Sequence, residues 1–321
     1  MKSCALIVGI NDYPKSPLRG AVKDAENIEK LLSENGDKSK NFFCRLITSK
    51  TASVTLSRLR SELIRLFNED ADKVLFYFSG HGFENSLGGY LVTQDARSYA
   101  EGLAISELML LANEALEKRK VREVILILDC CYSGHLGNVV KYNHMQSVMM
   151  PGLTILTASS EKQFSLEDSK GGVFTNLLCE GLNGAAADIR GRISTASLYN
   201  YLDQVLGAWE QRPQFKTHSR SMSLLRTVPP KVTIEDFAQL KEYFESSGSR
   251  LFLDPTWEVT VVGKDHPNVK KFNQLKKYRD AGLIKVDEKN VDLYWAAMNK
   301  GYVELTFQGR QYWKMVDKKI I

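Results

Sequence analysis

The chain has 321 residues, of which 43% are hydrophobic and 25% charged, values that are ordinary for a globular protein large enough to hold two domains. Its net charge of +5 is too small to indicate nucleic acid as a partner, and its five cysteines, which include no CxxC pair, indicate reduced thiols and a cytoplasmic location. No window approaches the ~18 apolar residues of a membrane span, and the short apolar run near the N-terminus is expected to be a strand rather than a signal peptide.

Short apolar runs alternate with amphipathic segments over the first two thirds of the chain. The predicted strands are 4–10, 42–47, 74–78, 90–92, 124–128 and 154–157, and the predicted helices are 21–32, 51–67, 105–116, 173–182 and 197–206. This alternation predicts an α/β fold with a mostly parallel sheet flanked by helices. Residues 134–151 show no period and are expected to form a mobile surface loop.

The composition changes near residues 227–230, so the predicted domains are 1–228 and 231–321. Helical patterns at 268–281 and 291–299, then a strand at 302–307 and a turn, suggest a small winged-helix-like α+β module. This module has 16 Lys and Arg against 13 Asp and Glu, and its basic residues do not gather on one helix face. We therefore expect it to bind a regulatory protein partner, with nucleic-acid sensing as the alternative.

Two of the predicted strands end in residues that carry chemistry. The strand at 74–78 runs into SGHG, which contains His81, and the strand at 124–128 runs into DCCYSG, which contains Cys131. The carboxyl ends of neighbouring strands meet at one sheet edge, so the imidazole and the thiol are expected to come within reach. An imidazole lowers the pKa of a thiol, and the backbone N–H groups of Gly82 and Cys131 are suited to hold an oxyanion.

Other uses of these cysteines fit the sequence less well. A thiol phosphatase needs an arginine six positions after its cysteine, where this chain has Leu136 or Gly137. A zinc site needs more ligands at short spacing than His135 and His144 supply, and an α/β-hydrolase places its nucleophile before its histidine. Cys130 is expected to be a buried structural thiol because adjacent residues of a strand point to opposite sides.

The two motifs resemble the signatures of the caspase-like cysteine peptidases, above all the metacaspases and their bacterial relatives, the orthocaspases. That family writes its second motif as Asp-x-Cys-x-Ser-Gly, which matches Cys131 as the nucleophile and His81 as its partner. The resemblance covers about residues 1–226 and includes ALIVGIND, LRGAVKDA, GGYLVTQDA, TASS, GVFT and RPQ. It implies the caspase–hemoglobinase fold and a cysteine endopeptidase, with a role in bacterial antiviral defence or cell death.

The resemblance also implies a specificity. Asp24 and Asp129 match the two acids that line the metacaspase pocket for the residue before the cut bond, so the expected substrates have Arg or Lys there. A pocket with two carboxylates attracts a cation and repels an acid. Two alternatives stay open: Asp24 is a solvated helix residue, or Asp129 braces a loop by accepting backbone N–H groups.

Many metacaspases need calcium, but residues 83–88 hold only one acid, Glu84, and a calcium ion takes ~6–8 oxygen ligands. We therefore expect no metal and no other cofactor to be needed. The basic residues at 118–122 and Lys141 are candidate self-cleavage points, but a solvated charged turn is the stronger explanation for them. The main alternative function is a catalytically silent caspase-like scaffold that recruits partners through residues 231–321.

Overall fold

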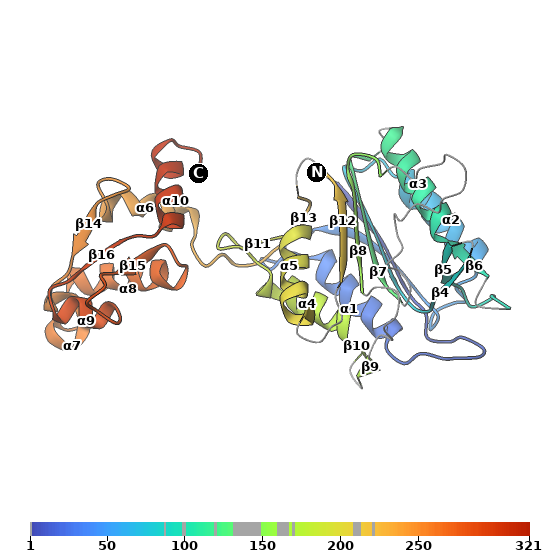
Figure 1. Ribbon diagram of the computed structural model, residues 1–321, viewed down its shortest axis with the longest axis horizontal. Helices are drawn as coiled ribbons and strands as arrows, with labels where there is room; N and C mark the ends of the chain where they lie inside the picture. The colour runs from blue at the N-terminus through green and yellow to red at the C-terminus, as the bar shows by residue number, and fades with distance from the viewer. Residues whose placement is uncertain are drawn as a thin grey trace. The chain divides into compact units, whose positions relative to one another are not determined.

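The computed structural model, shown in Figure 1, describes residues 2–86, 88–97, 101–118, 121–130, 149–158, 167–168, 171–207, 213–219 and 222–321. The chain forms two compact units. The first comprises Met1–Asp188 and Arg192–Val228, and the second comprises Ile189–Gly191 and Pro229–Ile321. In the part of the chain that the structure describes, no helix combines the length and apolar character needed to cross a membrane.

A six-stranded sheet forms the centre of the first unit, with the order β12-β8-β7-β3-β1-β2. Its strands are β1 (Ser3–Gly9), β2 (Phe42–Thr48), β3 (Lys73–Ser79), β7 (Glu123–Asp129), β8 (Leu153–Thr157) and β12 (Gln214–His218). The first five run parallel, and β12 joins β8 antiparallel at one edge. Strands β1, β3 and β7 are almost continuously buried, as expected for parallel strands covered on both faces. The predicted mostly parallel sheet flanked by helices is confirmed.

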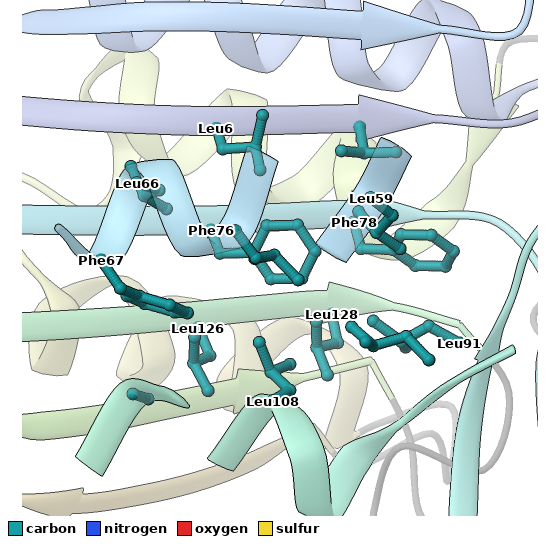
Figure 2. Packing of buried hydrophobic residues seen from close by; sticks show 14 of the residues in the cluster. Leu6, Leu59, Leu66, Phe67, Phe76, Phe78, Leu91, Leu108, Leu126 and Leu128 are labelled. Atoms are coloured by element: carbon teal, nitrogen blue, oxygen red, sulfur yellow. The ribbon is translucent and has the colours of Figure 1, made fainter. Parts of the chain in front are cut away.

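Helices cover both faces of this sheet (Figure 1). Helices α2 (Leu56–Phe67) and α3 (Ile105–Glu117) lie on one face, and their leucines pack with Phe76, Phe78 and Leu128 of the strands, as Figure 2 shows. Helices α1 (Ala21–Ser33), α4 (Val173–Glu180) and α5 (Thr195–Leu206) cover the other face. A π-helical segment, η2 (Gly181–Ala185), extends α4.

Helix α2 begins later than the sequence pattern predicts. The prediction placed its start at residue 51, but the helix begins at Leu56, where the Thr55 hydroxyl accepts the backbone N–H of Arg58. A side-chain cap of this kind satisfies one of the unpaired donors at the helix start and so sets the boundary.

Short strands complete the first unit. They form a three-stranded antiparallel sheet of β4 (Gly82–Asn85), β5 (Gly88–Val92) and β6 (Gly102–Ala104), and two pairs: β9 (Glu167–Asp168) with β10 (Gly171–Gly172), and β11 (Arg192–Ser194) with β13 (Leu224–Thr227). The sheet β4–β5–β6 directly follows the His81 motif, so the histidine lies between two sheets rather than in a simple loop.

The second unit has its own core around Phe237, Phe244 and Tyr278. Its helices are α6 (Ile234–Tyr243), α7 (Val259–Val262), α8 (Pro267–Asp280), α9 (Leu293–Met298) and α10 (Phe307–Asp317), with a 3₁₀ turn η4 (Pro255–Trp257). Its strands are β14 (Arg250–Phe252), β15 (Ile284–Val286) and β16 (Tyr302–Leu305), in the antiparallel order β14-β16-β15.

Two predictions concern the second unit: the turn after residue 307 and the winged-helix-like arrangement. The expected turn after residue 307 is wrong, because Thr306 caps α10 there by accepting the backbone N–H of Gly309. Additional helices and strands after the central domain are as expected, while the specific winged-helix comparison stays a prediction.

Candidate active site

The sheet brings the two motif-bearing strands together. β3 and β7 pair in parallel with Ser79 opposite Asp129, and the Gly80 backbone N–H donates to the Asp129 carbonyl at 3.3 Å. His81 therefore follows the end of β3 directly beside the end of β7. This is the carboxyl edge of the sheet, where open α/β folds place their sites.

Backbone and aromatic contacts hold the His81 side chain. Its Nε2 lies 2.7 Å from the Ser16 carbonyl oxygen, and its ring lies 4.5 Å from the Tyr13 ring, tilted by 51°. A carbonyl oxygen can only accept, so Nε2 carries the hydrogen and Nδ1 is the basic nitrogen of the neutral ring. The segment after β1 thus orients the imidazole.

Tyr13 also fixes the backbone around the histidine. Its hydroxyl accepts the His81 backbone N–H at 3.0 Å and donates to the Val92 carbonyl at 3.1 Å. A Cβ at Gly80 would overlap this hydroxyl, so the glycine before the histidine is required for the close approach of Tyr13.

The Gly82 backbone N–H points away from the neighbouring strand. Val92 donates its N–H to the His81 carbonyl at 2.9 Å, and Gly82 lies opposite Leu91 in the antiparallel pair β4–β5. Hydrogen-bonded and non-hydrogen-bonded pairs alternate in an antiparallel ladder, so Gly82–Leu91 is a non-hydrogen-bonded pair. The Gly82 N–H is therefore directed outward from the hairpin, and its role in holding an oxyanion stays a prediction.

The two acids predicted for substrate binding lie together and are buried. Asp24 of α1 is 2% exposed and Asp129 at the end of β7 is 6% exposed. Both face Gly172: a Cβ there would lie 3.0 Å from Asp129 Oδ2 and 3.4 Å from Asp24 Oδ2. The low exposure of Asp24 excludes the alternative that it is a solvated residue on the helix surface.

Each carboxylate has a hydrogen-bond donor from the start of α4. The Gly172 backbone N–H donates to Asp24 Oδ2 at 3.2 Å, and the Thr175 hydroxyl donates to Asp129 Oδ2 at 2.6 Å. The negative charges of Asp24 and Asp129 also affect the pKa of a neighbouring thiol. Burial, together with Asp24, Glu180 and Asp129, raises the pKa of Cys179 to about 12, so this thiol stays protonated at neutral pH.

A family model described as "Caspase domain" matches residues 2–225. The chain belongs to the caspase-domain family. Two solved structures show the same fold. Protein GSU0716 from Geobacter sulfurreducens is 19% identical, covers 71% of this chain and 98% of its own, and has a TM-score of 0.51. Caspase-1 from Spodoptera frugiperda is 14% identical, covers 71% of this chain and 90% of its own, and has a TM-score of 0.52. Comparison with curated protein sequences finds no match.

The caspase domain supports the assignment of the chain as a cysteine peptidase. Some of the residues predicted for the site and its surroundings lie outside the described part of the chain. These are Cys131, most of the expected loop at 134–151, the candidate self-cleavage residues Arg119, Lys120 and Lys141, and Arg212 of the RPQ match. Cys130, the described residue directly before Cys131, is 3% exposed and belongs to the apolar core, as expected for a structural thiol.

Four residues that hold this site were missed by the sequence analysis. They are Tyr13 and Ser16 around His81, and Tyr77 and Thr175 around Asp129. Thr175 lies in the GVFT match and Tyr13 in the turn after β1, so the segments were visible, but their partners were not. Among the described residues, no group of three or more His, Cys, Asp or Glu is arranged to hold a metal ion.

Proposed function

We propose that this caspase domain is a cysteine endopeptidase that cleaves after Arg or Lys, with Cys131 as the nucleophile and His81 as its general base. The observation that carries the specificity is the convergence of Asp24 and Asp129 on Gly172. The dyad is supported by the register of β3 and β7, because each of its members follows the pair Ser79–Asp129 by two residues.

The mechanism follows from the tautomer of His81. Nδ1 accepts the proton of the Cys131 thiol while the Ser16 carbonyl holds the Nε2 hydrogen. The thiolate attacks the scissile carbonyl carbon, and the backbone N–H groups of Gly82 and Cys131 bind the resulting oxyanion. The imidazolium then gives its proton to the leaving amine as the C–N bond breaks. Water, deprotonated by His81, hydrolyses the thioester and restores the thiol.

The specificity follows from charge. Two buried carboxylates beside one glycine give a cation two acceptors, and a charge-assisted hydrogen bond is typically worth ~1.5–3 kcal/mol. A substrate with Asp before the cut bond brings a third negative charge to the same place and is rejected.

The second unit supports a regulatory partner. Several of its large apolar side chains are exposed, including Phe252 at 67%, Phe307 at 80% and Val291 at 90%. Binding of a protein partner would remove these apolar side chains from water. Together with the resemblance to bacterial caspase-like peptidases, this favours an effector that is activated on demand, as in antiviral defence or cell death.

Fluorogenic peptides that end in Arg, Lys, Met or Asp test the proposal. We expect release of the fluorophore from the Arg and Lys peptides only, and no release by Cys131→Ala or His81→Ala. Cleavage after Asp would refute the specificity. Folded wild-type protein that cleaves none of the peptides, and whose Cys131 is not alkylated by iodoacetamide faster than a free thiol, would favour the scaffold.

A further inference from the structure

A chain of buried hydroxyl groups ends on one of the two pocket acids. The Tyr77 hydroxyl and the Thr175 Oγ1 lie 2.6 Å apart, and Thr175 donates to Asp129 Oδ2 at 2.6 Å. A threonine has one hydroxyl hydrogen, which Asp129 receives, so Tyr77 must donate to Thr175. The direction of the whole chain is thereby fixed, from Tyr77 through Thr175 to the carboxylate.

Every member of this chain is enclosed by the fold. Tyr77 and Thr175 are both 0% exposed. Burial, followed by the charges of Asp129 and Asp24, raises the pKa of Tyr77 well above its ordinary value. The phenol therefore stays protonated and remains a donor at any working pH.

Helix α4 connects this chain to the other acid. Thr175 lies in the first turn of α4, and Gly172, the residue before the helix, donates its N–H to Asp24 at 3.2 Å. One helix start therefore holds both carboxylates, through a backbone group for Asp24 and a side chain for Asp129. The positive end of a helix favours negative charge at this place.

We infer that Thr175, supported by Tyr77, is the positioning residue that sets the Asp129 carboxylate for binding the basic side chain of the substrate. This inference rests on the proposed function and deepens it. Thr175 does not touch the reacting atoms. It fixes the side-chain rotamer of Asp129, so its loss weakens recognition of Arg and Lys and leaves the chemistry at Cys131 unchanged.

Three variants separate positioning from folding. Thr175→Val has the same shape but no hydroxyl, and it leaves the Tyr77 donor buried without its acceptor. The double variant Tyr77→Phe/Thr175→Val removes both partners of the Tyr77–Thr175 hydrogen bond, so no buried phenol is left unpaired, while Asp129 still loses its donor as in Thr175→Val. Thr175→Ser keeps the hydroxyl and is the matched control.

The measurements are KM and kcat for an Arg peptide, the inhibition constant of a peptide aldehyde ending in arginine, the midpoint of thermal unfolding, and the rate of Cys131 alkylation. We expect KM and the inhibition constant to rise about tenfold or more in Thr175→Val and in the double variant. We expect kcat and the alkylation rate to stay within about twofold, and Thr175→Ser to match the wild type. The double variant should unfold at a higher temperature than Thr175→Val.

Two results would overturn this inference but leave the proposed function standing. One is that Thr175→Val binds the aldehyde within twofold of the wild type. The other is that the double variant binds the aldehyde more tightly than Thr175→Val and also unfolds at a higher temperature. Wild-type protein that neither cleaves Arg and Lys peptides nor binds the aldehyde would overturn both this inference and the proposed function.

Discussion

Gly172→Ala offers a sharp test of the proposed substrate-binding role of Asp24 and Asp129, because its expected effects on stability and on activity differ. Gly172 has φ −66° and ψ 132°, a conformation that alanine adopts without strain. Replacing glycine at such a position typically stabilises a protein by ~0.4–1 kcal/mol, because the unfolded chain loses freedom. The new Cβ would lie 3.0 Å from Asp129 Oδ2, so that carboxylate must move by a few tenths of an ångström. These two effects oppose each other, and we expect the unfolding temperature to change by less than about 3 °C.

Activity should respond much more strongly. The methyl group would contact both carboxylates, at 3.0 Å from Asp129 Oδ2 and 3.4 Å from Asp24 Oδ2, beside the place we assign to the cation of the substrate. Losing one charge-assisted hydrogen bond costs about 1.5–3 kcal/mol, which lowers kcat/KM for an Arg peptide roughly 10- to 150-fold.

The assay compares kcat/KM for two peptides that differ only in Arg or Met before the cut bond. The control is Gly207→Ala, since a Cβ at Gly207 meets no atom of the described residues within 4 Å. Unchanged activity of Gly172→Ala on the Arg peptide would refute our placement of the cation. A large fall in its unfolding temperature would refute the packing argument.

Three further predictions follow from the site and its surroundings. Cys131→Ala should abolish cleavage while Cys130→Ala keeps most of it, as measured by initial rates; the opposite result would assign the nucleophile to Cys130. A chelator should leave the cleavage rate unchanged, since we expect no calcium requirement, and rescue of a chelated sample by calcium would contradict this. Burial raises the pKa of both Cys44 and Cys179 from 9.0 to about 12. Between pH 9 and about 12 the two thiols are deprotonated in the unfolded chain but still protonated in the folded protein. The free energy of unfolding should therefore fall by up to ~1.4 kcal/mol per thiol for each pH unit. Unfolding by urea at pH 8, 9.5 and 11 measures this slope, and Cys44→Ala/Cys179→Ala should make it shallower, while buried Tyr77 keeps part of it above pH 10. Equal slopes for the two proteins would show that the thiols are not responsible.

The central sheet was predictable because its information is local. The apolar runs that form β1, β3 and β7 are continuous, and the observed strands differ from the predicted ones by only one or two residues. Strand β12 was missed because QFKTH is polar and only partly buried at an antiparallel edge, so it has neither a long apolar run nor a clear alternation.

The site residues, like the strands, could be predicted only where the sequence information is local. His81, Asp24 and Asp129 stand in recognisable motifs, and the fold places them at strand ends and at the start of a helix. Their supporting contacts depend on distant segments: Ser16 is 65 residues from His81, and Tyr77 is 98 residues from Thr175. Ser16 also acts through its backbone carbonyl, which every residue possesses, so no choice of side chain could reveal it.

The loop at Ile189–Gly191 belongs to the second unit although it lies within the caspase domain of the chain. Ile189 packs against the core of that unit, and its carbonyl accepts the backbone N–H groups of Lys231 and Val232. The polypeptide therefore passes between the units three times instead of once. A chain truncated near Val228 would lose the apolar neighbours of Ile189 and the backbone donors to its carbonyl, and would expose this loop to water.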